Sequence, residues 1–507
     1  MRTNGSSRTL QFLAAAAVAA FCVHSFSGNK ADVDLWGNVG FVKSWPGTEG
    51  FRFRNTFSFT EPDRAWVNHE WLAEYVFHRV YTLAGDPGLI LLKLLMGCAI
   101  VSLVVLSMRR CRVSGPLAFL FLLLMISTIS YGFAVRPHHF TYLLYAALFF
   151  FLQTRWRPWL LVCIAPFLGT VWANLHGAFF TGILLLVVYA VCEGLRGLKN
   201  REDRAHAWLV MSAAGLFAAG TLLNPYGIRL WNFVLHSAAR PRPYLSEWAP
   251  FNPLSDIAIH PDFVVLVVLS AAGILFARKR DVTGIVILGL TLVAALLMRR
   301  SILLFAITAG FVVPQHLEQV TAEPLRRLAA RLPAWLTATA LAAFAGVSIG
   351  YAATFNKTDP FRIEVKQADF PVDVVELMQR NNVQGNALIF FDWAEQCIWQ
   401  LYPRCRVFLD GRFESAYSGA TIDDYFNFLY RDGDWKRALG NYDTDIVLIH
   451  RGNPAYAAMA ALPDWSLICQ TEVAALFVKT ARHADLVARA RAGTLAIPPG
   501  RNHAYFP

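Results

Sequence analysis

The sequence predicts an α-helical polytopic membrane protein with about eleven transmembrane helices and a C-terminal extracytoplasmic α/β domain. Of the 507 residues, 56% are hydrophobic and only 16% are charged. Apolar runs of about 17–22 residues recur, each long enough to cross a bilayer core as a helix. After about residue 355 short apolar strands alternate with helices, which is typical of a small α/β fold with a largely parallel sheet.

The transmembrane segments are expected near residues 9–26, 88–107, 115–133, 139–153, 159–173, 178–194, 206–223, 262–277, 282–298, 301–314 and 334–354. Basic segments follow the even-numbered spans, for example MRRCR at 108–112 and ARKR at 277–280. Basic residues concentrate in cytoplasmic loops, so this pattern places the N-terminus inside and the C-terminal domain outside. It also accounts for the net charge of +11, which we therefore do not interpret as a nucleic-acid footprint.

The first apolar run, from Leu10 to Phe26, fits either an uncleaved helix or a signal peptide. No clear small-residue cleavage motif follows it, so an uncleaved helix is favoured. The expected domains are a transmembrane domain (1–354, with an outer loop at 27–87), an α/β domain (355–480), and a basic surface helix with a loose tail (481–507).

The α/β domain is expected to contain seven or more short elements. Helices are predicted at 371–382 and 394–403, two further amphipathic helices within 422–443, and strands at 385–391, 405–412 and 444–450, with a pair of strands within 465–480.

Asp34 is the first catalytic candidate, because it follows the first span within about one turn of the expected membrane edge. A carboxylate beside the membrane can serve as a general base that accepts a proton from an attacking hydroxyl. The alternative is that Asp32 or Asp34 only caps a helix. Trp36 could line a cavity and stack on a sugar, although tryptophans at a membrane interface need no such role.

The segment from Pro62 to Tyr81 is predicted to be an amphipathic helix on the membrane surface. His69 and Glu70, beside a tryptophan, are further candidates for the catalytic site, whereas Glu74 and His78 fit a solvated face. These carboxylates and imidazoles could hold a divalent cation such as Mg²⁺ or Mn²⁺, but their spacing is not diagnostic and the metal stays open.

A group of polar residues is expected at one depth, at the outer ends of the helices. Arginine offers a planar, charged fork to phosphate oxygens, so this group could bind a phosphate or pyrophosphate. The alternative for each residue is a polar cap or an arginine extending to lipid headgroups. The candidate phosphate ligands are Arg136, His138, His139, Arg299 and Arg300, and the candidate cavity-lining residues are Asn174, His176 and Asn224.

Two features of the C-terminal domain leave alternatives open. Cys397 and Cys405 are close enough in sequence for a disulfide on an oxidising side of the membrane, or could both stay free. Asp410, Gly411 and Arg412 end a predicted strand, where α/β folds often bind ligands, but a turn with an internal Asp–Arg pair fits equally well.

These motifs together resemble the GT-C glycosyltransferase superfamily, and more narrowly a group of bacterial multi-span membrane proteins of that type. The matching segments are Asp34-Leu35-Trp36, Asn55–Thr60, His69–Leu72, Arg136–Phe140, Asn174–Gly177, Asn224–Gly227 and Phe408–Arg412. The likeness runs through nearly the whole chain. The chain departs from the pattern at Gly37 and Asn38, where the group has a further Trp or His.

The resemblance implies a glycosyltransferase of a bacterial inner membrane, with its C-terminal domain in the periplasm. It would take a sugar from a polyprenyl-phosphate carrier and transfer it to a glycan, lipid or protein acceptor. Asp34 matches the family's first-loop acidic residue, and Glu70 is a second acidic candidate. Two alternatives stay open: a polymerase or ligase of whole lipid-linked glycans, and a non-catalytic membrane scaffold or transport component.

Overall fold

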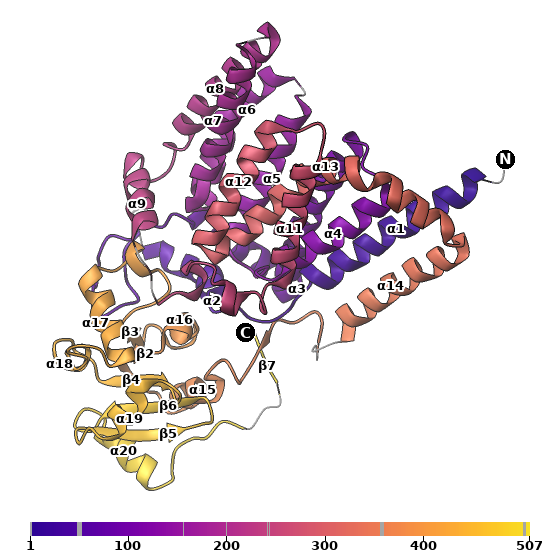
Figure 1. Ribbon diagram of the computed structural model, residues 1–507. Helices are drawn as coiled ribbons and strands as arrows, with labels where there is room; N and C mark the ends of the chain where they lie inside the picture. Colours follow the sequence, from indigo (N-terminus) through magenta and orange to yellow (C-terminus); the bar gives the residue numbers. More distant parts are fainter. Residues whose placement is uncertain are drawn as a thin grey trace. The chain divides into compact units, whose positions relative to one another are not determined.

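The computed structural model describes residues 3–47, 53–155, 157–198, 200–240, 242, 244–354, 359–499 and 503–507. The chain forms two compact units (Figure 1). The first combines Met1–Gly28, Gly88–Ile228 and Ala239–Pro360, and the second combines Asn29–Pro87, Arg229–Ala238 and Phe361–Pro507. The segment 29–87 therefore shares a unit with the C-terminal residues.

Every expected transmembrane segment is helical. The helices are α1 (Thr3–Phe26), α3 (Trp71–Arg110), α4 (Gly115–Ser130), α5 (His138–Thr154), α6 (Pro158–Leu175), α7 (Phe180–Arg196), α8 (Arg201–Gly220), α11 (Pro261–Phe276), α12 (Val282–Leu297), α13 (Ile302–Arg331) and α14 (Ala334–Thr354). Six segments of the described chain are long and apolar enough to cross a membrane by length and composition. They are Arg8–Phe26, Trp71–Arg110, Pro158–Leu175, Gly177–Arg196, Arg299–Ala329 and Ala334–Thr354. The protein is thus a helical membrane protein.

Shorter elements connect these helices. They are α9 (Ile228–Ala239) and α10 (Pro253–Asp256), with the 3₁₀ turns η2 (Gly177–Phe179), η3 (Ser246–Trp248) and η4 (Arg299–Ser301).

Small residues allow close packing between α6 and α8, which lie side by side in Figure 1. A Cβ atom on Gly169 would come within 2.2 Å of the Phe217 carbonyl oxygen, and one on Gly220 within 2.0 Å of the Pro166 oxygen. Helices in membranes commonly meet through such small residues, because van der Waals packing rather than hydrophobic burial holds them together.

The helix α3 is interrupted a little more than a third of the way along its length. Gly85 has φ 59° and ψ −152°, and Pro87 follows it. Glycine adopts positive φ without a steric penalty, and proline cannot donate a backbone hydrogen bond, so a kink is expected there.

The second unit is built on a five-stranded sheet of order β3-β2-β4-β6-β5. The strands are β2 (Gly385–Ile389), β3 (Cys405–Val407), β4 (Ile446–His450), β5 (Trp465–Gln470) and β6 (Ala474–Lys479). The helices are α2 (Leu35–Gly40), α15 (Val372–Arg380), α16 (Ala394–Leu401), α17 (Gly419–Tyr430), α18 (Arg437–Gly440), α19 (Pro454–Ala460) and α20 (Ala484–Arg491). The 3₁₀ turns are η1 (Phe41–Gly47), η5 (Phe391–Trp393) and η6 (Phe413–Ser415).

The sheet is mixed, which corrects the expectation of a largely parallel one. β2 is parallel to β3 and β4, whereas β6 is antiparallel to β4 and β5. The short turn between β5 and β6 has no room for a crossover helix, so this pair must be antiparallel. A two-stranded sheet of β1 (Glu364–Val365) and β7 (Ala504–Tyr505) places a strand within the tail that we expected to be loose.

The segment 29–87 pairs with the edge of this sheet. The Val407 amide donates to the Phe57 carbonyl at 2.9 Å, and the Phe59 amide donates to the Val407 carbonyl at 3.2 Å. This parallel bridge extends the β3 edge and supplies partners for backbone groups that an edge strand would otherwise expose.

The predicted helix from Pro62 to Tyr81 is wrong in its first half, because helix α3 begins at Trp71. The residues before it instead form a turn that brings the chain back beside residues 53–55. The Asp63 amide donates to the Asn55 carbonyl at 3.0 Å, and the Trp66 amide donates to the Phe53 carbonyl at 3.0 Å. Asp63 also adopts φ 60°, which ends any helical run.

Candidate functional site

A buried acidic cluster, comprising Asp34, Glu395 and Asp410, lies in the second unit. Glu395 is on α16 and is 6% exposed, and its Oε2 accepts a hydrogen bond from the Gly37 amide at 2.9 Å. Asp34 and Asp410 are both near enough to act electrostatically on the Glu395 carboxyl. Three acidic side chains, from two segments far apart in the sequence, therefore share one location.

Two glycines allow this close approach. A Cβ on Gly37 would come within 2.3 Å of Glu395 Oε2, and a Cβ on Gly411 within 2.4 Å of Glu395 Oε1. The same atom on Gly411 would lie 3.4 Å from Asp34 Oδ1. The carboxyl groups of Asp34 and Glu395 therefore both lie within a few ångströms of Gly411.

Burial is the main cause that raises the pKa of Glu395 well above its ordinary 4.5, and the charges of Asp34 and Asp410 raise it further. Neighbouring carboxyl groups cannot all ionise in a poorly solvated place, so one of them retains a proton. The cluster therefore combines Glu395, which holds its proton to a higher pH than an ordinary glutamate, with neighbouring carboxyl groups, the pairing that acid–base chemistry uses.

The Asp34 side chain is half-buried and makes no capping hydrogen bond to α2, although it occupies the N-cap position. Asp32 instead holds the turn, since its Oδ1 accepts from the Asp34 amide at 3.2 Å. Trp36 is 1% exposed, with its ring 4.8 Å from that of Phe370. The structure thus puts Trp36 in the core of the unit.

Asp410 and Arg412 form a buried ion pair, with Nη2 and Oδ2 2.7 Å apart. Arg412 also donates to Asn55 Oδ1 at 2.6 Å and lies 4.8 Å from the centre of the Trp66 ring. Tyr417 donates to Asp410 Oδ2 at 2.6 Å. The internal Asp–Arg pair, which was one of the two interpretations of this turn, is therefore present.

His69 and Glu70 lie just before α3, with His69 Nε2 3.6 Å from Glu70 Oε1. The expectation of a solvated Glu74 is wrong: Glu74 is 4% exposed and accepts a hydrogen bond from Asn68 Nδ2 at 2.7 Å. Glu70 and Glu74 are near enough to interact electrostatically, and Glu74 also interacts with Arg412. The Glu70–Glu74 pair is thus linked to Arg412, which contacts Asp410.

The first unit contains a separate basic cluster of Arg136, Arg242 and Arg300 around one carboxylate, Glu247. Arg136 Nη1 lies 3.0 Å from Glu247 Oε2, and Arg300 Nη1 lies 3.6 Å from Glu247 Oε1. Burial and the neighbouring Arg300 lower the pKa of Arg242 to about 10. Three guanidinium groups against one carboxylate leave a net positive charge, which favours an anion.

Aromatic contacts hold two of these arginines. The guanidinium carbons of Arg242 and Arg300 lie 3.6 Å and 4.5 Å from the centre of the Trp248 ring. Stacking on an indole fixes a guanidinium while leaving its edge N–H groups for a ligand.

Three of the predicted histidines gather beside this cluster. The rings of His138 and His139 are 4.4 Å apart, and those of His138 and His176 are 6.3 Å apart. His176 Nδ1 lies 2.9 Å from Thr141 Oγ1, and His139 Nδ1 lies 3.0 Å from the Arg136 carbonyl oxygen. His138 is near enough to Arg136 and Arg300 to interact electrostatically with both.

The other candidates of this group hold local structure. Arg299 Nε lies 2.8 Å from Asp256 Oδ2, away from Glu247. Asn174 Nδ2 donates to the Leu223 carbonyl at 2.9 Å, and Asn224 Oδ1 accepts from the Tyr226 amide at 2.7 Å. Asn174, near the end of α6, thus holds the turn that follows α8, and Asn224 closes the turn in which it lies.

Sequence reasoning did not identify Glu395, Arg242, Glu247 or Trp248. Glu395 lies within an ordinary amphipathic helix, and the other three lie in a long connection without a recognisable motif, so no local signal marks them. In the described part of the chain, no group of three or more His, Cys, Asp or Glu side chains is arranged to hold a metal ion. Cys397 and Cys405 are both free and buried.

Comparison with known proteins adds no assignment: no family model matches the chain, and no curated protein matches it.

Proposed function

We propose that the protein is a membrane glycosyltransferase that moves a sugar from a polyprenyl-phosphate carrier to an acceptor hydroxyl at the outer face of a bacterial inner membrane. The observation that carries the proposal is the proximity of Asp34 to Glu395. Glu395 holds its proton to a higher pH than an ordinary glutamate does, and the half-buried Asp34 beside it takes the role of general base in this proposal.

In the proposed reaction the acceptor oxygen attacks the anomeric carbon of the donor sugar. The acceptor O–H proton passes to Asp34, a new C–O bond forms, and the bond from the anomeric carbon to the carrier phosphate breaks with its electron pair on the phosphate. The leaving group is already an anion, so stabilising its charge matters more than protonating it.

The basic cluster of the first unit, taken by itself, has the chemistry that a phosphate requires. Arg136, Arg242 and Arg300 carry three positive charges, and Glu247 is the carboxylate that they surround. Hydrogen bonds from arginine to phosphate oxygens are charge-assisted and often paired, which suits a polyprenyl-phosphate headgroup.

The test is a turnover assay on the full-length protein in bilayers, with a panel of polyprenyl-phosphate sugars and measurement of released carrier phosphate. We expect Asp34→Asn to lower turnover by about 10²–10⁴-fold, the range for loss of a general base. The matched control is Asp63→Asn, an exposed aspartate of the same segment. Parallel reactions with a chelator test whether a divalent cation takes part.

Equal turnover in the Asp34→Asn and wild-type proteins would contradict the proposed role of Asp34. A scaffold or transport role would instead be favoured if cells that lack the protein show growth or export defects and cells with the Asp34→Asn variant do not.

A further inference from the structure

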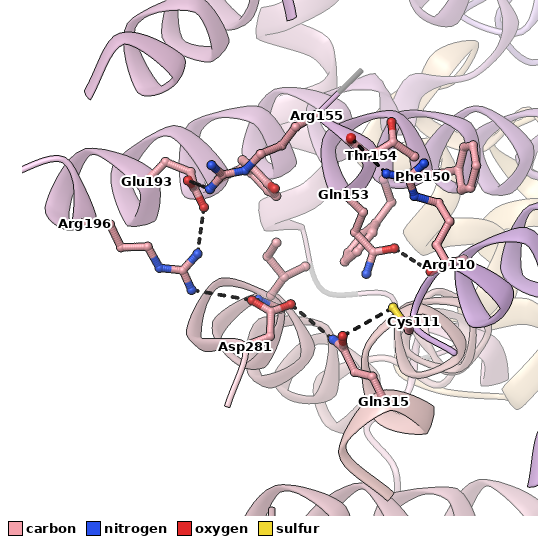
Figure 2. Close-up of a pocket in the computed structure, with 15 residues that line it drawn as sticks. Arg110, Cys111, Phe150, Gln153, Thr154, Arg155, Glu193, Arg196, Asp281 and Gln315 are labelled. Carbon is pink, nitrogen blue, oxygen red and sulfur yellow. Dashed lines mark hydrogen bonds and ion pairs between the residues drawn. The ribbon is translucent and has the colours of Figure 1, made fainter. Parts of the chain in front are cut away.

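A polar pocket in the first unit lies among helix ends and is not part of the proposed catalytic chemistry. Its volume is about 190 Å³. Because one buried water needs only about 10–15 Å³, the pocket can hold a polyatomic group. Its walls come from α3, α5, α7, α12 and α13, and Figure 2 shows the side chains that line it.

Three arginines and two carboxylates line this pocket: Arg110, Arg155, Arg196, Glu193 and Asp281. Glu193 is 1% exposed and is approached by both Arg155 and Arg196 (Figure 2). A buried carboxylate needs compensation of this kind, since an unpaired charge in such a place is costly. Glu193 thus serves to position two guanidinium groups, and the lining keeps a net positive charge.

These arginines keep unused donors. A guanidinium has five N–H donors. Arg196 donates to Glu193 at 2.9 Å and lies 3.6 Å from Asp281, while Arg155 contacts Glu193 and, at 2.8 Å, Asp203. Arg110 makes a single hydrogen bond within the described chain, to the Thr154 carbonyl at 3.3 Å.

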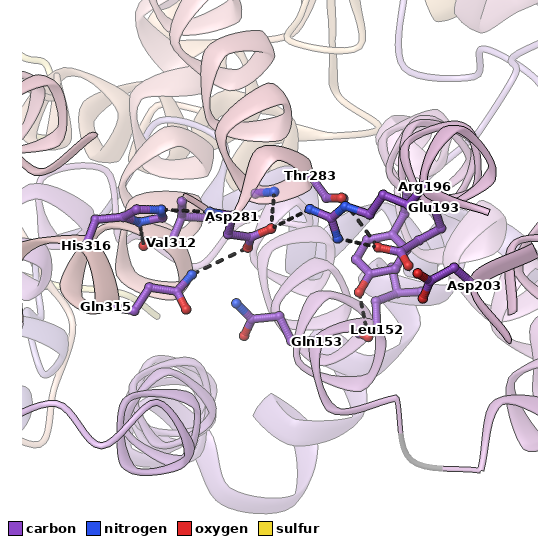
Figure 3. A network of polar contacts seen from close by, with 12 residues as sticks. Leu152, Gln153, Glu193, Arg196, Asp203, Asp281, Thr283, Val312, Gln315 and His316 are labelled. Atoms are coloured by element: carbon purple, nitrogen blue, oxygen red, sulfur yellow. Dashed lines mark hydrogen bonds and ion pairs between the residues drawn. The ribbon is translucent and has the colours of Figure 1, made fainter. Parts of the chain in front are cut away.

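A second layer fixes the far wall of the pocket (Figure 3). The Asp281 amide donates to His316 Nε2 at 3.0 Å, and Asp281 Oδ1 caps α12 by accepting from the Gly284 amide at 3.2 Å. Gln315 Nε2 lies 3.4 Å from Asp281 Oδ2. This wall is therefore held before any ligand arrives, which lowers the entropy cost of binding.

We propose that this pocket binds a phosphate group, with Arg110, Arg155 and Arg196 donating to its oxygens. Basic pockets between transmembrane helices are suited to phospholipid headgroups, and a soluble phosphate has the same chemistry. The sequence predicts that these helix ends face the cytoplasm. The inference is independent of the proposed glycosyl transfer.

The experiment measures binding to the full chain in a phosphate-free, non-ionic detergent, by calorimetry and by the shift in Tm. The probes are dioctanoyl phosphatidic acid, the matching dioctanoylglycerol, which lacks the phosphate, and inorganic phosphate. Arg110→Gln is compared with Arg109→Gln, a neighbouring exposed arginine that does not line the pocket. Since Arg110 is exposed, its substitution should leave the Tm without ligand nearly unchanged.

We expect phosphatidic acid to bind and to raise the Tm, and Arg110→Gln to weaken that binding about tenfold or more, with Arg109→Gln near wild type. Binding of phosphatidic acid but not inorganic phosphate would identify a lipid headgroup, and equal binding of both would identify a free phosphate. The proposal is overturned if dioctanoylglycerol is as effective, if no phosphate probe binds, or if both variants lose affinity equally.

Discussion

At the scale of single residues, Arg412 is a buried charge of the second unit that is surrounded by aromatic rings. Its guanidinium carbon lies 4.8–5.8 Å from the centres of four aromatic rings, those of Phe41, Phe57, Trp66 and Tyr417. Together with its ion pair to Asp410, these contacts hold the segment 29–87 and the C-terminal segment in one arrangement. The acidic cluster depends on that arrangement, because Asp34 and Glu395 belong to different segments.

Arg412→Gln should lower the free energy of unfolding by about 3–5 kcal/mol, because it leaves the buried Asp410 without its cation. The measurement is denaturant or thermal unfolding of the full-length protein in detergent. Arg406→Gln, an exposed arginine on β3, is the control and should change stability by less than about 0.5 kcal/mol. A similar loss in both variants would contradict a special role for Arg412.

The raised pKa of Glu395 predicts a pH dependence of stability. An unfolded glutamate ionises near 4.5, whereas folded Glu395 holds its proton to a higher pH. Between these two values the folded state binds more protons, so the free energy of unfolding falls as the pH rises, by at most about 1.4 kcal/mol per pH unit.

Glu395→Gln should therefore flatten the decline of Tm as the pH rises above about 4.5, the ordinary pKa of glutamate. Glu472→Gln, which changes an exposed residue in the turn between β5 and β6, should keep the wild-type slope. An unchanged slope in Glu395→Gln would show that Glu395 is not the group that titrates.

A side chain that stands in a local motif can be singled out from the sequence, whereas a residue without such a motif cannot. Asp34 follows an apolar span and precedes a tryptophan, so its position is visible in sequence. Glu395 becomes significant only through Gly37, 358 residues away along the chain. Nothing in the local pattern of α16 distinguishes that glutamate from a solvated one.

At the scale of secondary structure, periodicity predicted the helices, which satisfy their own backbone hydrogen bonds, and the positions of the strands. It was wrong at 62–70, where the turn with Asn55 replaces the helix. It was also wrong on strand direction, because an apolar strand has the same pattern in parallel and antiparallel pairs when both faces are buried.

A prediction at this scale concerns the turn after β3. Gly411→Ala should cost about 1–3 kcal/mol, because the added methyl group overlaps the Glu395 carboxyl group and must displace it. If glycosyl transfer is the function, turnover should fall as well. Gly440→Ala, with no atom near the added methyl group, is the matched control. Wild-type stability in Gly411→Ala would contradict the close packing around Glu395.

At the scale of the whole molecule, the sequence predicted a helical membrane part and a C-terminal part that contains both helices and strands. Six helices of the described chain meet the length and composition needed to cross a bilayer, fewer than the eleven spans expected, although all eleven segments are helical. The grouping of residues 29–87 with the C-terminal residues could not be predicted, because the pairing of Phe57 with Val407 leaves no trace in the composition of either segment.

The separation of these partners has a consequence for how the chain is made. Asn55 and Arg412 are 357 residues apart in sequence, yet they are hydrogen-bonded. At a synthesis rate of about 5–20 residues per second, roughly 20–70 s pass between them on the ribosome. During that interval the segment 29–87 is already complete but lacks the strand edge and the cation that later hold it. In every newly made copy this segment therefore waits for its C-terminal partners, and slower translation lengthens that interval.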